Sequence, residues 1–384
     1  MSIPMNYLAR YILWNYSNVT DYKKFPFREV LNSQPASFFN DDPEEKRIVS
    51  DLLKGTNYVV KGARPIGSLD DLLISEGTTS FIITRDNSVV YEKYYNNSSR
   101  ESVNTSFSIS KSFTSALIGK AIEEGHIKSG SDPVTEYIPE LKKRLSGNLT
   151  VMHLLGMSSG LHYDPKYYPW SDEPRSYYYP DIKQLILKSA RQEYEPDQYF
   201  KYVNYNTIIL GMILERATGM DPAEYLQEKI WKVIGMEYPA SWSTDSRRTC
   251  FPKMESGINA RSIDYAKFGK LYLNRGKWGD KQVLPASWVK ESTCPPATRN
   301  DTYYTSKNYY PYSIFFRDRQ LYYKYGWWGF SRDDGSYDFM ALGIHGQFIY
   351  VCPDKQIVIV RNGKKWGKVA WWPALFRQII DKLP

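Results

Sequence analysis

Cysteine and histidine are scarce in this sequence, and their spacing argues against a metal centre or a disulfide framework. The 384 residues include three cysteines, Cys250, Cys294 and Cys352, which lie far apart without a Cys-x-x-Cys pair. An odd, sparse set of this kind is not typical of a disulfide-bonded scaffold or of a thiolate zinc site. The four histidines show no His-x-His or His-x-x-x-His spacing. We therefore expect neither a metal nor another cofactor.

Long apolar runs are also missing. No stretch of about 18 apolar residues exists, so we expect no membrane span in this chain. Residues 1–17 include Arg10 and lack the apolar core and small-residue cleavage site of a signal peptide. As the chain stands we expect the cytoplasm, whereas trimming of an N-terminal signal or anchor would instead indicate the periplasm or secretion.

Long runs of one charge are absent as well. The net charge is +8, from 50 basic and 42 acidic residues, which could indicate a nucleic-acid or membrane-surface binder. The basic residues are scattered: short clusters occur, as at 142–144 and 364–365, but there is no long basic run. We therefore expect no nucleic-acid partner, and keep binding of nucleic acid or a membrane surface as a minor hypothesis.

What the sequence does contain is a regular succession of apolar patterns. β-type patterns occupy 81–95, with a hairpin signal at Asp86-Asn87-Ser88, and return at 337–344, 348–353 and 356–363. Helical patterns lie mainly between them, at 43–54, 108–125, 150–155, 181–192, 204–218, 222–232, 262–274, 286–292 and 372–382. This order predicts an α/β (α+β) fold, with an antiparallel sheet flanked by helices and built from both ends of the chain.

The same order predicts two units. We expect an α/β sheet domain from residues 1–125 and 251–384, and an inserted, mainly helical domain from 126–250. Within the insertion, 157–180 is rich in proline and aromatic residues and is predicted as a long loop. Tyr167, Tyr168 and Trp170 are candidates for a lid over a substrate, although simple packing of the loop explains them equally well. Aromatic residues at 303–304, 309–310 and 327–328 are further candidates for pocket walls.

The stretch SFSISKSF, residues 106–113, places a serine three residues before a lysine at the start of a helix. Side chains at i and i+3 on a helix lie about 5–6 Å apart, so Lys111 can reach the hydroxyl of Ser108. A serine hydroxyl needs such a base to act as a nucleophile, and a helix N-terminus favours developing negative charge. A helix start with a polar face is the simpler explanation of these letters alone.

A second motif changes this assessment. Tyr202-Val203-Asn204 precedes an apolar helix, and a Tyr-x-Asn sequence in this place follows Ser-x-x-Lys in a known group of serine hydrolases. The chain resembles the superfamily of class C β-lactamases and penicillin-binding proteins, most of all its branch of 6-aminohexanoate-dimer hydrolases and esterases. The resemblance extends over most of the sequence, through the segments at 107–127, 132–141, 153–161, 257–276 and 284–289.

The resemblance implies a β-lactamase/transpeptidase-like fold and a role for each motif residue. Ser108 would attack a carbonyl and form an acyl-enzyme, and Lys111 and Tyr202 would share the role of base. For this, either the pKa of Lys111 must fall or Tyr202 must act as a phenolate. Asn204 would bind Lys111 or a substrate amide, and could also cap the helix that follows.

The third motif of the family, Lys-Thr-Gly or His-Thr-Gly, departs from the pattern. One register places it at Ala341-Leu342-Gly343 and the other at His345-Gly346-Gln347. We favour Gly343, which would make the backbone N–H groups of Ile344 and Ser108 the oxyanion hole and leave His345 as a pocket residue or a turn residue. The family's lysine is then Ala341, so recognition of the carboxylate of a penicillin is expected to be poor.

The sequence therefore predicts a serine hydrolase acting on a small ester, or on an amide like the 6-aminohexanoate dimer. Its partner would be that small-molecule substrate, and a homodimer is one assembly compatible with the resemblance. The alternatives are a β-lactamase or D-amino-acid peptidase of the same fold, or a catalytically inactive protein that binds β-lactams or peptides.

Overall fold

The computed structural model describes residues 5–14, 16–54, 58, 68–297, 304 and 320–383. Its N-terminal part runs through α1 (Met5–Trp14), β1 (Phe27–Val30), α2 (Pro43–Lys54) and α3 (Leu69–Ser75). Helix α2 has the predicted bounds, whereas α1 and β1 were not predicted, because α1 is apolar on both of its faces and β1 has only four residues. None of the helices in the described ranges is long and apolar enough to cross a membrane.

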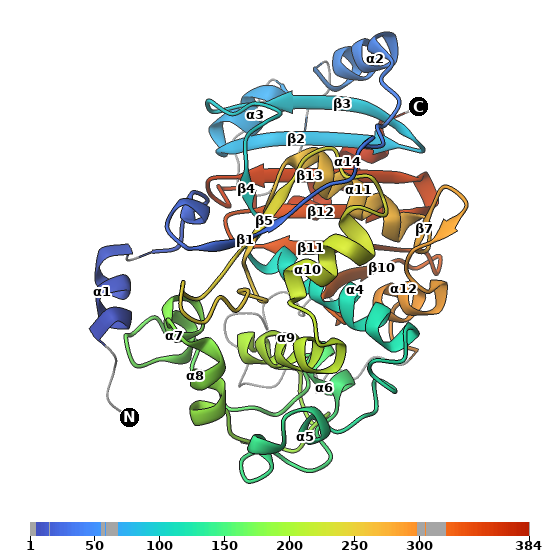
Figure 1. The fold of residues 1–384 in the computed structure, drawn as a ribbon. Coiled ribbons are helices and arrows are strands. Elements are labelled where there is room, and N and C mark those ends of the chain that lie inside the picture. Colours follow the sequence, from blue (N-terminus) through green and yellow to red (C-terminus); the bar gives the residue numbers. More distant parts are fainter. Residues whose placement is uncertain are drawn as a thin grey trace.

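A seven-stranded antiparallel sheet takes its strands from both ends of the chain (Figure 1). Its order is β3-β2-β13-β12-β11-β10-β9. The strands are β2 (Thr78–Arg85), β3 (Ser88–Tyr94), β9 (Leu321–Lys324), β10 (Trp327–Ser331), β11 (Tyr337–Gly343), β12 (Gln347–Cys352) and β13 (Ile357–Gly363). The predicted fold class, an antiparallel sheet of both chain ends flanked by helices, is confirmed.

Helices cover both faces of this sheet. Because side chains alternate along a strand, Ile349 and Val358 join the core beneath α11 (Ser262–Leu273), while Phe348 and Ile359 face the core that includes α14 (Trp372–Ile380). Apolar residues therefore occupy both faces of these strands and make two cores, one on each side of the sheet.

The helical part surrounds two buried helices, α4 (Ser110–Glu123) and α9 (Asn204–Thr218), which contact each other. Both are buried on nearly all sides, polar residues included, because other elements enclose them. Around them lie shorter helices: α5 (Val134–Tyr137), α6 (Val151–Leu155), α8 (Ile182–Ser189), α10 (Pro222–Leu226) with its π-helical continuation Gln227–Trp231, and α12 (Ala286–Thr293).

The interpretation of 157–180 as a continuous loop is wrong, because α7 (Asp172–Tyr178) lies within it. Its proline, Pro174, sits in the first turn, where the missing N–H disturbs no helical hydrogen bond. The proline and the clustered tyrosines of this segment are therefore compatible with a helix, although their abundance predicted a loop.

A smaller sheet, in the order β1-β5-β6-β4, leads to the segment with Ser108. Its strands are β1, β4 (Asn104–Thr105), β5 (Ala240–Ser243) and β6 (Ile258–Ala260), and a separate hairpin joins β7 (Lys277–Trp278) to β8 (Lys281–Gln282). Strand β5 falls in the range predicted to be mainly helical, yet pairs with the N-terminal β1. The division into two domains at 125 and 250 stays a prediction.

Candidate active site

Ser108 lies in a tight turn between β4 and α4. A 3-10 turn, Phe107–Ile109, precedes α4, which begins at Ser110 rather than at the predicted residue 108. Phe107 has a φ of +48°, a left-handed conformation that is unusual for a bulky residue and characteristic of functional sites. The turn is fixed from inside by the hydroxyls of Ser106 and Ser110, 2.8 Å apart, and the backbone N–H of Ile258 donates to Ser110 Oγ.

Lys111 reaches Ser108 as the spacing predicts. Its Nζ lies 3.0 Å from Ser108 Oγ and 3.0 Å from the backbone carbonyl oxygen of Glu255, and the residue is only 3% exposed. Burial lowers the pKa of Lys111 to about 8, against the opposing effect of the Glu255 and Glu173 carboxylates. The amine is therefore close to losing its proton near neutral pH.

Tyr202 completes a group of three side chains around the Ser108 hydroxyl. Its phenol forms a hydrogen bond with Ser108, and its ring centroid is 4.9 Å from Lys111 Nζ. Trp328 and Tyr323 pack on the ring at centroid distances of 5.7 Å and 5.8 Å. Burial raises the pKa of Tyr202, and the bond to Ser108 offsets only part of this rise. Tyr202 therefore stays protonated when Lys111 begins to lose its proton.

Asn204 has other partners than those expected. Helix α9 begins at Asn204 with Val203 as its N-cap, so the predicted capping role is wrong. Its Nδ2 instead lies 3.3 Å from each carboxylate oxygen of Glu173 and 3.0 Å from the hydroxyl of Tyr163, and none of the hydrogen bonds of the described residues joins it to Lys111. A substrate-binding role for Asn204 stays a prediction.

Glu173, which the sequence analysis did not single out, is the centre of this network. Tyr163 donates a hydrogen bond of 2.7 Å to its carboxylate, and burial raises its pKa. Its charge acts on both Lys111 and Tyr202. The only sequence signal is an acidic residue in the first turn of α7, a helix hidden by the proline and tyrosine content of its segment.

A second buried carboxylate, that of Glu255, also acts on Lys111. Glu255 is 1% exposed, accepts a 2.7 Å hydrogen bond from Ser256 and lies 3.4 Å from Nζ of the buried Lys253. It is 144 residues from Lys111 in the sequence, and no motif marked it.

Gly343, the glycine of the favoured register of the third motif, lies against the Ser108 turn. A Cβ atom at this position would lie 2.4 Å from the carbonyl oxygen of Ser106, so only glycine permits the approach. Strand β10 pairs with β11 no further than Met340, and the following residues of β11 extend past its end toward the turn. Ile344, 45% exposed, follows directly. The assignment of its N–H and that of Ser108 to an oxyanion hole stays a prediction.

His345 lies in the turn between β11 and β12, with a φ of +63°. Its Nε2 is 3.0 Å from the carbonyl oxygen of Ser17, and its ring packs edge-on against Phe107 at 5.1 Å. Burial lowers its pKa. The residue thus links the N-terminal segment to the Ser108 turn, and a contact with substrate stays a prediction.

The three lid candidates differ in their contacts and exposure. Tyr167 packs against the N-terminal segment: its backbone carbonyl accepts a hydrogen bond from Tyr11, and its ring stacks on Tyr16 at 5.6 Å. Tyr168 and Trp170 stack on each other at 5.3 Å and are 53% and 65% exposed. A lid role for these three residues stays a prediction.

The aromatic pairs named as further wall candidates have mixed outcomes. Trp328 packs on Tyr202, and Tyr304 contacts Phe200 instead. Tyr303, Tyr309 and Tyr310 lie outside the described residues.

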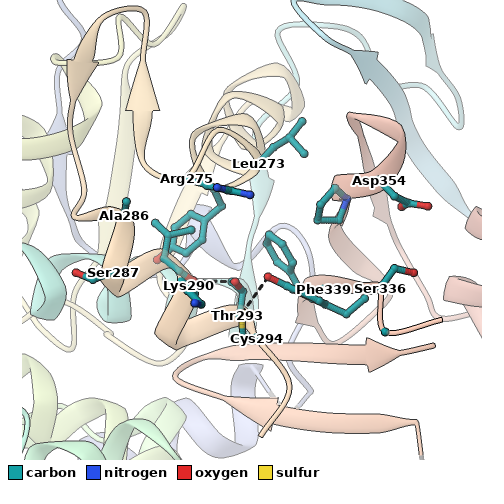
Figure 2. Close-up of a pocket in the computed structure, with 15 residues that line it drawn as sticks. Leu273, Arg275, Ala286, Ser287, Lys290, Thr293, Cys294, Ser336, Phe339 and Asp354 are labelled. Carbon is teal, nitrogen blue, oxygen red and sulfur yellow. Dashed lines mark hydrogen bonds between the residues drawn. The ribbon is translucent and has the colours of Figure 1, made fainter. Parts of the chain in front are cut away.

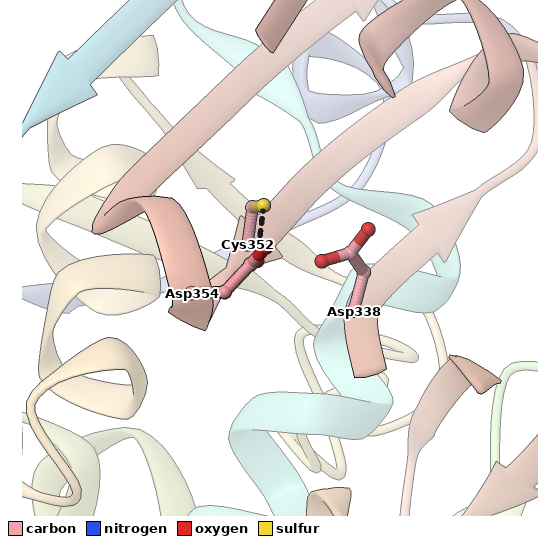
Figure 3. A group of neighbouring side chains, drawn as sticks. All are labelled: Asp338, Cys352 and Asp354. Atoms are coloured by element: carbon pink, nitrogen blue, oxygen red, sulfur yellow. Dashed lines mark hydrogen bonds between the residues drawn. The ribbon is translucent and has the colours of Figure 1, made fainter. Parts of the chain in front are cut away.

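The described residues contain one cluster with the composition of a metal site, Asp338, Cys352 and Asp354 (Figure 3). Its ligand atoms lie within 4.8 Å of one another. However, Arg332 forms ion pairs with both aspartates, Arg377 Nη1 is 3.2 Å from the Cys352 sulfur, and burial raises the pKa of that thiol. Two guanidinium groups and a protonated thiol fit an internal ion-pair network, not a bound cation.

A cavity of about 600 Å³ lies between α11, α12 and the start of β11 (Figure 2). Its walls include Lys290, Phe339 and a pair formed by the Cys294 sulfur and the Tyr337 hydroxyl, 3.2 Å apart. None of the predicted site residues lines it. The cavity is therefore separate from the group around Ser108.

Comparison with known proteins agrees with this architecture. The family model described as Beta-lactamase matches residues 73–370. The 6-aminohexanoate-dimer hydrolase of Paenarthrobacter ureafaciens is 26% identical over 328 residues, which cover 81% of this chain and 77% of that protein. The resemblance stated from the motifs is thereby confirmed.

Solved structures share the fold. A Bacillus anthracis protein provisionally named 6-aminohexanoate-dimer hydrolase superposes with a TM-score of 0.75 at 24% identity, covering 97% of this chain and 95% of that one. The octameric penicillin-binding protein homologue of Pyrococcus abyssi gives 0.61 at 22% identity, covering 82% and 78%. The homodimer named above as one compatible assembly of the present chain stays a prediction.

Proposed function

Because the chain belongs to the Beta-lactamase family and is a hydrolase of that fold, we propose that it is a serine hydrolase that forms an acyl-enzyme on Ser108. The observation that carries the proposal is the 3.0 Å distance between Lys111 Nζ and Ser108 Oγ, in a site where Lys111 has a pKa of about 8. A lysine amine that is partly neutral near pH 7 can accept the proton of a serine hydroxyl.

The geometry supports different roles for the two candidate bases, with Lys111 as the base and Tyr202 as the proton donor. Neutral Lys111 takes the proton of Ser108 as the oxygen attacks the substrate carbonyl, and the backbone N–H groups of Ser108 and Ile344 bind the oxyanion. Tyr202, still protonated, donates its proton to the leaving alcohol or amine and regains one from the Lys111 ammonium. Water then attacks the acyl carbon and gives one proton to the same pair of residues. The bond between this carbon and Ser108 Oγ breaks, the acid leaves, and the pair returns the proton to Ser108 Oγ.

A small ester, or an amide like the 6-aminohexanoate dimer, is the proposed substrate class. The relative with 26% identity is named for the amide. In the favoured register, the buried Ala341 takes the place of the cation by which the family binds the penicillin carboxylate. A β-lactam would therefore lack a counter-ion in this register. The alternatives, a β-lactamase, a D-amino-acid peptidase or an inactive binding protein, are outcomes of the test below.

The test is covalent labelling followed by substrate screening. A fluorophosphonate should add once to the wild-type protein, as seen by intact mass, and not to Ser108→Ala. The matched control is Ser131→Ala, which replaces an exposed serine elsewhere and should leave labelling unchanged. Labelling with turnover of p-nitrophenyl esters or the 6-aminohexanoate dimer would support the proposal. Turnover of penicillins alone, or stable labelling without any turnover, would favour the alternatives, and labelling of Ser108→Ala at the wild-type rate would contradict the assignment.

A further inference from the structure

Helix α1 is apolar on both of its faces, and the contacts of the described residues cover only one of them. The covered face packs on the segment around α7: the Tyr7 hydroxyl donates to the carbonyl of Pro169 and the Tyr11 hydroxyl to that of Tyr167. Trp14 packs on the same side, against Phe25. In Figure 1, α1 lies at the margin of the molecule beside α7, away from the large sheet.

The opposite face of α1 consists of Met5, Ala9, Ile12 and Leu13, and we call it the α1 outer face. These positions are spaced i, i+4, i+7 and i+8, so they share one side of the helix. Met5, Ile12 and Leu13 are 81%, 63% and 78% exposed. A helix that is apolar all round is normally enclosed, so this face lacks the cover that its composition requires.

An exposed aromatic pair lies beside this helix. Tyr168 and Trp170 flank Pro169, whose carbonyl binds Tyr7 of α1, and they are stacked on each other in solvent. Tryptophan and tyrosine are the side chains most enriched at the boundary between lipid and water, because they combine an apolar ring with a polar atom. The pair is therefore a second exposed apolar group near α1, in a chemical form that suits a lipid interface.

Two exposed cations lie on the segments that contact α1. Exposed Lys166 lies two residues before Tyr168, and exposed Arg247 follows Asp245, whose carbonyl binds Arg10 of α1. Within the described ranges, neither cation forms an ion pair. The whole chain carries a net charge of +8. An exposed apolar helix face, with unpaired cations on the segments next to that helix, is complementary to an anionic lipid surface.

We propose that the α1 outer face and the Tyr168–Trp170 pair dock this protein on the surface of an anionic lipid bilayer. With ten residues, α1 is about 15 Å long, half the thickness of the hydrocarbon core, so it lies in the interface and does not span it. The docked edge is connected to the candidate site, because Ser17, three residues after α1, binds His345 beside Phe107. The proposal stands independently of the hydrolase activity.

The experiment is sedimentation of the full chain with large unilamellar vesicles of phosphatidylglycerol and phosphatidylcholine, compared with vesicles of phosphatidylcholine alone. Wild type should bind the anionic vesicles, less so at high salt, and bind the neutral vesicles more weakly. The double variant Ile12→Glu/Leu13→Glu should lower the partition coefficient at least ~10-fold, because it places two charges in the α1 outer face, which would be buried in the lipid. Ile74→Glu, on α3 and 47% exposed, is the matched control and should bind as wild type does.

Circular dichroism and light scattering, run on the same samples, make the result decisive. Both charged variants are substitutions of exposed side chains and should keep the wild-type spectrum. Failure of wild type to bind anionic vesicles, or undiminished binding of the double variant, would overturn the proposal. A wild-type dimer that the double variant converts to a monomer, without vesicle binding, would also overturn it and assign the face to a second copy of the chain.

Discussion

Replacing Gly343 with alanine tests whether the end of β11 holds the Ser108 turn in its reactive position. The added Cβ atom would meet the Ser106 carbonyl oxygen at 2.4 Å, whereas ordinary contacts begin at 3.4 Å. The two segments must therefore separate by about 1 Å. Neither is a flexible side chain: Gly343 pairs with Gln347 of β12, and the Ser106 N–H donates to the carbonyl of Ile258.

The expected magnitude follows from this displacement. A shift of ~1 Å in the position of a reacting group can cost about 100-fold in rate. Because Ser108 is two residues from Ser106 and the proposed donor Ile344 is next to Gly343, the shift separates the nucleophile from one half of the oxyanion hole. We expect kcat/KM for a p-nitrophenyl ester to fall about 100-fold, at a cost in stability of ~1–3 kcal/mol typical of overpacking.

The assay is steady-state hydrolysis together with the rate of fluorophosphonate labelling, each corrected for the folded fraction from thermal denaturation. Gly147→Ala is the matched control, because a Cβ atom there meets nothing within 4 Å, and it should retain wild-type rates. A folded Gly343→Ala protein with wild-type rates of hydrolysis and labelling would show that the third motif does not position the Ser108 turn.

Three further predictions concern the proton transfers. If neutral Lys111 is the base, kcat/KM should rise with pH and level off above an apparent pKa near 8, and a flat profile from pH 6 to 9 would contradict this role. Lys111→Ala and Tyr202→Phe should each lower kcat ~100- to 10,000-fold while the melting temperature shows the protein still folded, and full activity would remove that residue from the mechanism. Glu173→Gln removes a carboxylate that raises the pKa of Lys111, so the rising limb should move to lower pH, and an unmoved limb would show that Glu173 does not act on the base.

Much of the fold could be predicted from the sequence because its strongest signals are local. Helical patterns in the sequence identified α2, α9 and α11, and the hairpin signal at 86–88 separated β2 from β3. The pairing of β1 with β5 could not be predicted, since their residues are about 200 positions apart and each strand is only four residues long. Short strands carry too few side chains to show a period, and their partners are chosen by tertiary packing.

The site divides in the same way. Ser108 and Lys111 are one helical turn apart, so their contact follows from their spacing. The Tyr202 motif could be recognised because an apolar helix follows it. Glu173 and Glu255 carry no such signal, because a carboxylate becomes a site residue only when the chain folds it beside a buried cation. The partners of Asn204 depend on α7, which was not predicted because its segment is rich in proline and tyrosine.

These two carboxylates explain why the pKa of Lys111 stands near 8 and not lower. Burial disfavours the ammonium form, and the net shift from the usual 10.5 corresponds to roughly 3 kcal/mol at 1.36 kcal/mol per unit. The charges of Glu255 and Glu173 act in the opposite direction and limit this shift. A base with a much lower pKa would be neutral at every working pH but would bind the serine proton too weakly, so the most effective value lies near the working pH. The fold thus sets the strength of the proposed base by balancing the dry surroundings of Lys111 against two acids brought from distant parts of the chain.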